Sequence, residues 1–194
     1  MRIMVASDIH GSGYFCEKMV DAYRREKCDR LLLLGDILYH GPRNDLPREY
    51  NPKRVIELLN GISGEILCVR GNCEAEVDQM VLDFPVMAEY AVLFVKGRMI
   101  YATHGHVFNE DRLPKLKDGD ILLHGHTHVA ACREINGGRN VYMNPGSVSI
   151  PKEGSVNGYM VIDDGGNGNE DKGCGKAAAE WKNLDGEILW NYIL

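Results

Sequence analysis

Residue types that bind metal ions are concentrated in six short motifs of this chain. The motifs are Asp8-Ile9-His10-Gly11, Gly35-Asp36, Gly71-Asn72, His104-Gly105-His106, Gly125-His126-Thr127-His128 and Asn144-Pro145-Gly146-Ser147. All seven histidines of the chain lie in or beside these motifs, a distribution that packing or solubility would not produce. Two carboxylates, an amide oxygen and at least four imidazoles are enough to hold two divalent ions side by side.

Taken singly, the first three motifs also have plain structural interpretations. Asp8 and His10 stand two apart at the end of a predicted strand, where positions i and i+2 share a face, so both could reach one ion. Asp36 follows a buried strand and could cap a helix, or could bridge two metals through its two oxygens. Asn72 after a glycine is typical of a turn, although it also offers a neutral oxygen ligand.

The later motifs differ in how strongly they indicate metal binding. His126 and His128 stand two apart beside a glycine, and packing alone rarely needs such a pair. Together with His104 they favour a metal-binding role. The Asn144–Ser147 motif, in contrast, reads as a tight turn.

One arrangement of these residues gives each of two ions four protein ligands. Mixed nitrogen and oxygen ligation suits Mn, Fe, Zn, Co or Ni better than Ca or Mg. With a bridging hydroxide, the centre would keep a charge of about +1, which suits a phosphodiester monoanion, and the ions would activate that water for in-line attack. The ligand sets are Asp8, His10, Asp36 and His128 for one ion, and Asp36, Asn72, His104 and His126 for the other.

Composition limits the classes of function. The 194 residues fit a single domain, and 44% hydrophobic with 26% charged residues is ordinary for a globular protein. A net charge of -6 argues against a polynucleotide partner but allows a small phosphate ester. Six cysteines form no C-x-x-C pair, and no apolar run approaches the roughly 18 residues of a membrane span. We expect a cytoplasmic protein with reduced thiols and no membrane partner.

The elements that must position these residues follow from hydrophobic patterning. The first part of the chain predicts a β-α-β-α-β series in which each strand ends at a metal-type residue, where open α/β sheets place their sites. Its strands are predicted at 2–7, 30–34 and 65–69, and its helices at 12–28 and from Pro52 onward.

The second half of the chain predicts strands joined by hairpins, which suggests an α/β domain over 1–194 with two packed mixed sheets and helices outside. A flexible surface loop is predicted at 163–179 because this segment is rich in Gly, Asn and Asp, and a last hairpin is predicted to turn at Asp185-Gly186. The strands are predicted at 90–95, 99–103, 120–123, 129–135, 139–143 and 159–162.

The order of the motifs is similar to that of the calcineurin-like metallophosphoesterase superfamily, over nearly the whole chain to about residue 162. At finer grain it resembles the YfcE-type bacterial phosphodiesterases. The resemblance implies a four-layer αββα sandwich, a dinuclear site usually active with Mn²⁺, and the ligand sets given above. The stretches that carry it are 6–11, 40–44, 69–73, 76–80 and 144–152.

One position departs from the superfamily pattern. Most members carry a histidine after the Gly-Asn pair, whereas this chain has Cys73, as the YfcE-type subgroup does. A thiol is a poor proton donor to a leaving group, so we expect Cys73 to be a neutral pocket residue. His106 is the first alternative donor, followed by His40 or water, and esters with good leaving groups should be preferred. Arg43 is a candidate contact to a substrate phosphate or an ordinary exposed arginine. His124 is expected to be a packing residue or a residue that supports the metal ligands from behind.

Two alternatives to a phosphodiesterase remain open from the sequence. The same fold serves as a protein-interaction subunit in retromer, where catalysis is weak or lost, so a binding scaffold is one alternative. A phosphomonoesterase is the other, and it would need more positive charge around the pocket. Exposed hairpin edges would allow a homo-oligomer, such as a dimer or tetramer, but the sequence leaves the oligomeric state open.

Overall fold

The computed structural model describes residues 1–166 and 176–194, which form two β-sheets flanked by helices. The first sheet has six strands in the order β11-β10-β9-β1-β2-β3, with β1, β2 and β3 parallel. These strands are β1 (Arg2–Ala6), β2 (Arg30–Leu33), β3 (Ile66–Cys68), β9 (Gly158–Asp163), β10 (Ala178–Asn183) and β11 (Ile188–Ile193).

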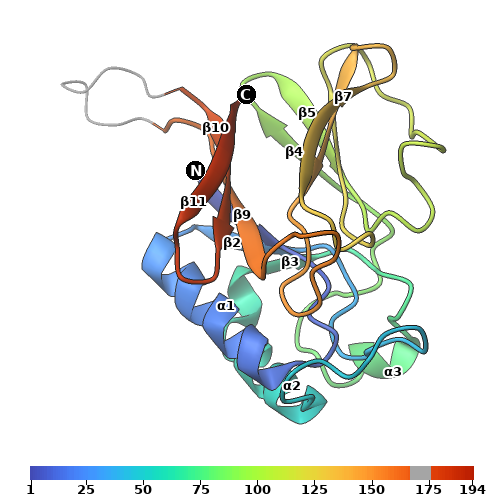
Figure 1. The fold of residues 1–194 in the computed structure, drawn as a ribbon, viewed down its shortest axis with the longest axis vertical. Coiled ribbons are helices and arrows are strands. Elements are labelled where there is room, and N and C mark those ends of the chain that lie inside the picture. Colours follow the sequence, from blue (N-terminus) through green and yellow to red (C-terminus); the bar gives the residue numbers. More distant parts are fainter. Residues whose placement is uncertain (167–175) are drawn as a thin grey trace.

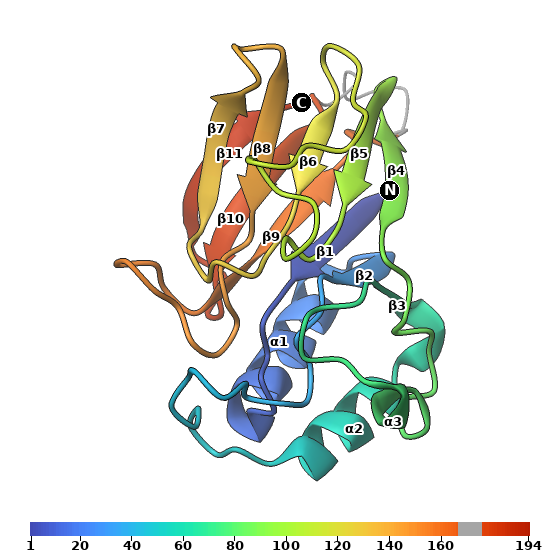
Figure 2. The same cartoon turned by 90° about the vertical axis from the view of Figure 1, so that its right-hand side faces the viewer.

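The second sheet has five strands in the order β4-β5-β6-β8-β7, and β5, β6 and β8 are parallel. The two sheets stand side by side in Figure 1, and Figure 2 shows the second sheet in front of the first. This arrangement confirms the α/β fold of two mixed sheets with flanking helices. The strands are β4 (Ala91–Val95), β5 (Arg98–Ala102), β6 (Ile121–Leu123), β7 (Ala131–Ile135) and β8 (Asn140–Asn144).

The described helices are α1 (Gly13–Glu26), α2 (Pro52–Asn60) and α3 (Glu76–Gln79), with a short 3-10 helix at Ser63–Glu65. Helix α1 is capped by Ser12, whose hydroxyl accepts a hydrogen bond from the backbone N–H of Phe15. Helix α2 has Pro52 in its first turn, directly after the cap residue Asn51. None of the described helices is long and apolar enough to cross a membrane.

Strand β1 is buried on both faces, which explains its continuous apolar run. Met4 and Ala6 pack with α1 and α2, while Ile3 and Val5 point into the core between the two sheets. The sheet that carries the first metal-type residues is therefore covered on both sides, and only its strand ends are free to build a site.

The predicted boundaries agree with these elements to within two residues, and the Asp185-Gly186 turn lies between β10 and β11 as predicted. Of the loop predicted at 163–179, Asp163 belongs to β9, and Ala178 and Ala179 belong to β10. Residues 167–175 of that prediction lie outside the described residues. Its flexibility stays a prediction.

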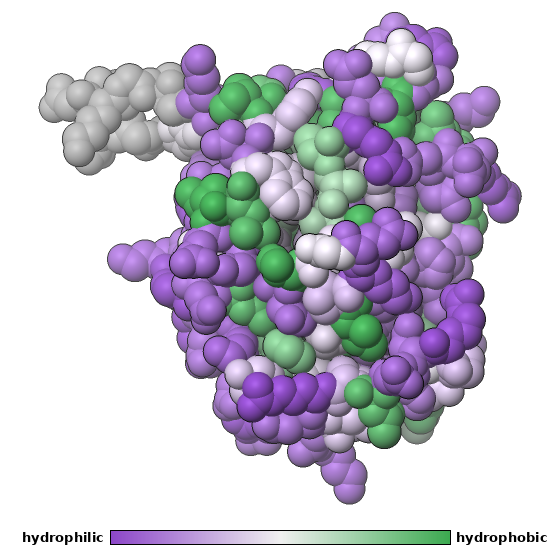
Figure 3. Space-filling view, viewed as in Figure 1, coloured by the Kyte–Doolittle hydropathy of each residue, from purple (hydrophilic) through white to green (hydrophobic). Residues whose placement is uncertain are grey.

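Hydrophobic side chains on the face shown in Figure 3 form separate patches among hydrophilic ones. The edge strand β11 exposes Ile188, Leu189 and Ile193. An unpaired edge of this kind is compatible with a homo-oligomer, which stays a prediction.

Candidate metal centre

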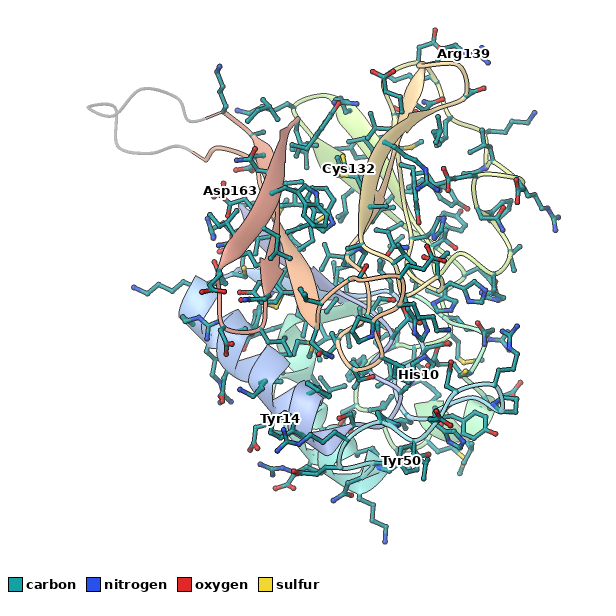
Figure 4. The ribbon with its side chains drawn as sticks, in the orientation of Figure 1. His10, Tyr14, Tyr50, Cys132, Arg139 and Asp163 are labelled. Carbon is teal, nitrogen blue, oxygen red and sulfur yellow. The ribbon has the colours of Figure 1, made fainter. Side chains whose placement is uncertain are left out.

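The metal-type residues of the first half lie just beyond the carboxyl ends of three neighbouring parallel strands. Asp8 and His10 follow β1, Asp36 follows β2 and Asn72 follows β3. Figure 4 shows His10 between the strand ends and the loop that carries Tyr50. Parallel strands bring their carboxyl ends to one edge of a sheet, and this is why residues far apart in sequence meet here.

The other three histidines of the site follow strands of the second sheet. His104 follows β5, and His126 and His128 follow β6, which pairs in parallel with β5. The two sheets present their strand ends to the same place, since the backbone N–H of His126 donates to Asp8 Oδ2 at 3.0 Å.

Three of the histidine rings are held by backbone carbonyls behind them. A carbonyl oxygen can only accept, so Nδ1 of each ring carries the hydrogen and Nε2 of the neutral ring presents a lone pair to the site. Fixing a ring through its far nitrogen is typical of metal-binding histidines. The acceptors are Tyr39 for His10, Leu34 for His104 and Ile150 for His128, at 2.8, 2.7 and 2.7 Å.

The first group of ligand atoms is formed by Asp8, His10 and His128. The Nε2 atoms of the two rings are 3.2 Å apart, and Asp8 Oδ1 lies 3.3 Å from His128 Nε2 and 3.6 Å from His10 Nε2. Asp8 is completely buried, and its Oδ1 has no hydrogen-bond partner. Three potential ligand atoms that converge in a buried site form a group that could hold a cation.

The second group is formed by Asp36, His104 and His126, with Asn72 beside them. His104 Nε2 lies 3.1 Å from both Asn72 Oδ1 and His126 Nδ1, and 3.5 Å from Asp36 Oδ2. Asp36 Oδ2 is also 3.7 Å from His10 Nε2. The Asp36 carboxylate therefore lies between the two groups, as a bridging ligand would.

The electrostatics of both groups also call for positive charge. Burial disfavours protonation of His104, but its contacts with Asp36 and Asp8 outweigh burial and raise its pKa to about 9. Burial, together with the neighbouring His104, lowers the pKa of His126 to about 4. The pKa values of both aspartates are lowered in spite of burial, because the imidazoles stabilise the carboxylates. The donor set thus fits two divalent cations.

Five of the seven proposed ligands have a left-handed backbone, which is uncommon for residues other than glycine. Such a conformation costs about 1–3 kcal/mol per residue and persists only where the surroundings impose it. These residues and their φ angles are Asp8 (59°), His10 (50°), Asp36 (55°), His126 (65°) and His128 (62°).

This backbone corrects one sequence argument. Asp8 and His10 were expected on one face of a strand, but β1 ends at Ala6 and both residues have positive φ. The strand geometry is wrong for these positions, although the two side chains do reach the same group of ligand atoms. A left-handed turn, imposed by the bonds from Asp8 N to Gly35 O and from His10 N to Asp36 O, brings them together.

The Asn144–Ser147 motif connects the ligand loops, as its interpretation as a tight turn allows. Asn144 Nδ2 donates to Gly125 O at 2.9 Å, and Ser147 Oγ donates to Asp8 O at 2.8 Å. Ser149 Oγ donates to the same oxygen at 3.0 Å. The motif therefore positions the Asp8 loop against the His126 loop.

The sequence analysis missed Glu74, which is almost fully buried. Its carboxylate accepts from the backbone N–H groups of Asp36, Ile37 and Gly71 and so joins two ligand loops. Burial and the charge of Asp36 raise its pKa in spite of these donors. A carboxylate two residues after Asn72 was the available signal, and the sequence could not show that it faces inward.

Two glycines let these loops approach one another. A Cβ on Gly71 would lie 2.2 Å from Asp36 Oδ1, and one on Gly125 would lie 1.9 Å from Ser7 Oγ. Both contacts are far closer than atoms tolerate, so each glycine is required by the close approach of the neighbouring side chain.

Comparisons with known proteins agree with this geometry. The sequence profile of the calcineurin-like phosphoesterase superfamily domain matches residues 1–165. The chain belongs to this superfamily. Phosphodiesterase YfcE of Escherichia coli strain K12 is 42% identical over 163 residues, which are 84% of this chain and 88% of that protein.

Solved structures extend the likeness to the whole chain. The structure of YfcE, described as a phosphoesterase from E. coli, has a TM-score of 0.88 at 37% identity and covers 100% of this chain and 99% of its own. A Vps29 variant from Entamoeba histolytica has a TM-score of 0.60 at 18% identity, covers 100% and 99% of the two chains, and shares the fold alone.

In this phosphoesterase a pocket of about 350 Å³ opens over the ligand groups. It contains both Cys73 and Arg43, two of the four substrate candidates. Its lining residues are Asp36, Gly41, Pro42, Arg43, Asn44, Asn72, Cys73, His126, Thr127, His128 and Lys152.

The other two candidates, His106 and His40, are not among the residues that line this pocket. His106 is exposed beside the second group, with its ring centroid 5.4 Å from that of His104. His40 packs edge-on between the rings of Tyr39 and Tyr50. Of the four substrate candidates, Cys73 and Arg43 therefore line the pocket, whereas His106 and His40 do not.

The thiol of Cys73 donates to Asp36 Oδ2 at 3.3 Å. Burial and the charge of Asp36 raise its pKa, which favours the neutral thiol that the sequence predicts. His124 is buried with its ring against Tyr142, which agrees with its expected packing role.

Proposed function

We propose that the protein is a phosphodiesterase that hydrolyses a small phosphodiester with the help of two divalent metal ions. The observation that carries this proposal is the position of Asp36 Oδ2 between two groups of ligand atoms, at the base of a pocket. The identity with a relative named phosphodiesterase supports it.

Two ions would be held by the ligand sets inferred from the sequence, with Asp36 common to both. When bound, such a pair supplies an acidified water for attack on phosphorus and neutralises the phosphoryl oxygens. We propose Mn²⁺ as the metal, and Ni²⁺, Co²⁺, Fe²⁺ and Zn²⁺ share its preference for mixed ligands.

The protein's own residues set the geometry of this chemistry. The N–H of Cys73 donates to Asp36 Oδ1 at 2.9 Å and leaves Oδ2 to face both groups. Since Asp8, His10 and His104 are almost fully buried, their ligand atoms are oriented before any substrate arrives. The pocket is open to solvent, since Asn72 and Thr127 in its lining are exposed.

Among the residues that the structure describes, the pocket lining offers no good acid to protonate the leaving oxygen. Cys73 is the pocket residue at the position of the usual histidine, and its raised pKa makes it a poor acid. His106 and His40 lie outside the pocket lining. We therefore assign protonation to solvent, which favours esters with good leaving groups, and assign contact with a substrate oxygen to Arg43.

The first test is the hydrolysis of bis-p-nitrophenyl phosphate by metal-stripped protein and by protein reloaded with Mn²⁺. Activity should require the metal and should disappear in Asp36→Ala. Asp185→Ala is the matched control, because it removes an 81% exposed aspartate from a distant turn. Metal content measured on the same samples should reach two ions per chain in the wild type.

Substrate charge separates the remaining alternatives. A phosphodiesterase should turn over a p-nitrophenyl diester faster than p-nitrophenyl phosphate, and the reverse order would favour the phosphomonoesterase. Two bound metals without hydrolysis of either ester would favour the interaction scaffold. The cytoplasmic location expected from the sequence stays a prediction.

A further inference from the structure

Two loops of the pocket carry cations that are not among the proposed metal ligands. Arg43 belongs to the loop 41–44, and Lys152 follows the Asn144–Ser147 motif. The backbone N–H of Lys152 donates to His128 O at 3.0 Å, so this loop runs beside a proposed metal ligand. We call residues 41–44 and Lys152 the pocket rim.

Neither cation is neutralised. Within residues 1–166 and 176–194, neither Arg43 nor Lys152 has an ion-pair partner. Lys152 Nζ donates to Asn44 Oδ1 at 3.3 Å, and Asn44 Nδ2 donates to His40 O at 2.9 Å, which fixes the amide oxygen toward the lysine. An amide holds the ammonium in place without cancelling its charge.

These charges exceed what the reacting group needs. The chain has a net charge of -6, yet among the described residues that line the pocket the only acidic one is Asp36, which is a proposed metal ligand. Two ions with their carboxylates and a hydroxide already leave a charge of about +1, which balances a phosphodiester monoanion. The rim adds two cations beyond this balance, and a further negative charge on the bound molecule would complement them.

We propose that Arg43 and Lys152 form a subsite for a second anionic group, so that the substrate is a phosphodiester with a carboxylate or phosphate on one arm. This inference rests on the proposed function and names its substrate class. Arg43 offers paired donors that match the two oxygens of such a group, and Lys152 adds a point charge held by Asn44.

Binding can be tested without turnover by using phosphinates, which have no ester bond to cleave. The probes are methyl(propyl)phosphinate and methyl(2-carboxyethyl)phosphinate, whose arms are similar in size but differ in charge. A 2-phosphonoethyl analogue distinguishes a phosphate-like group from a carboxylate. Calorimetry with Mn²⁺-loaded protein should show about tenfold tighter binding of the charged-arm probes.

Lys152→Gln and Arg43→Gln should each reduce this preference, and the double variant should remove it. Lys53→Gln, which removes an exposed lysine of α2 outside the pocket, should keep it. Equal affinity for charged and uncharged arms in the wild type, or an unchanged preference in the double variant, would overturn the subsite.

The proposed function can fail separately from this inference. If the charged-arm probes bind preferentially but no p-nitrophenyl diester is hydrolysed, the phosphodiesterase is wrong and the anion subsite stands. If diesters are hydrolysed without any preference for a charged arm, the subsite is wrong and the phosphodiesterase stands.

Discussion

The proposed metal ligands and the pocket rim face the same pocket but are built in opposite ways. Asp8, His10 and His104 are at most 1% exposed, and each ring is held by a backbone carbonyl behind it. In the rim, Arg43 and Lys152 are exposed, and the lysine is held by one neutral contact. The difference implies that the chemistry is fixed by the fold, whereas substrate choice depends on side chains that can change without disturbing it.

The largest effect on activity should come from removing one of the proposed metal ligands. Asp36→Ala removes the carboxylate that lies between both groups, and we expect a loss of activity of about 1000-fold or more. The metal content should fall below two ions per chain. Initial rates and metal analysis on one preparation would check both, and full activity with a single bound ion would contradict the shared role of Asp36.

A second substitution crowds the loops that carry the proposed ligands but removes no ligand. Gly125→Ala puts a methyl group against Ser7 Oγ and Asp8 Oδ2, and we expect a loss of about 2 kcal/mol of unfolding free energy. Gly64→Ala is the control, because a Cβ there meets nothing within 4 Å. Urea unfolding would compare the two. Equal stability of both variants would show that the loops have room to move.

Placing an imidazole in the pocket should test whether this site lacks a proton donor to the leaving group. We expect Cys73→His to raise the hydrolysis rate about tenfold for diesters with poor leaving groups, because such esters need a proton most. The gain should be small for p-nitrophenyl esters. A series of aryl diesters would give the dependence of rate on leaving-group pKa, and an equal gain across the series would argue against a missing proton donor.

The smallest effect should arise at the rim. Because Arg43 and Lys152 are exposed, salt should screen them, and we expect KM for a charged-arm diester to rise about threefold at high salt. The buried ligands should be less sensitive, so kcat should change little. Steady-state kinetics over a range of NaCl concentrations would separate the two, and a fall in kcat with constant KM would assign the salt effect to the metal centre.

Much of the fold could be read from the sequence. The continuous apolar runs of β1 and β2, the helical spacing over 12–28 and Pro52 at the start of α2 predicted the parallel half of the first sheet to within two residues. The second half was predicted through its hairpin turns, such as Asn136-Gly137-Gly138 between β7 and β8. The role of Glu74 could not be predicted, because an acidic residue in a loop has no periodic signal that distinguishes a buried carboxylate from a solvated one.

The sequence by itself determined which atoms are offered to a metal. Motifs such as His126-Thr127-His128 supply imidazoles, and their places after strands bring them to one edge of the fold. The ligand types are read directly from the residues, and their convergence at one edge follows from the parallel β-α-β order that the hydrophobic pattern predicts.

Only the tertiary structure decided how those atoms are aimed. The left-handed backbone at Asp8 and His10 is imposed by bonds to the loop after β2, and the orientation of His128 by a carbonyl at Ile150. The tertiary structure also packs His40 against Tyr50, outside the pocket lining, and places Lys152 at the pocket rim. The physical reason is that an uncommon backbone conformation or a ring tautomer is set by partners distant in sequence, whose positions exist only once the sheets have formed.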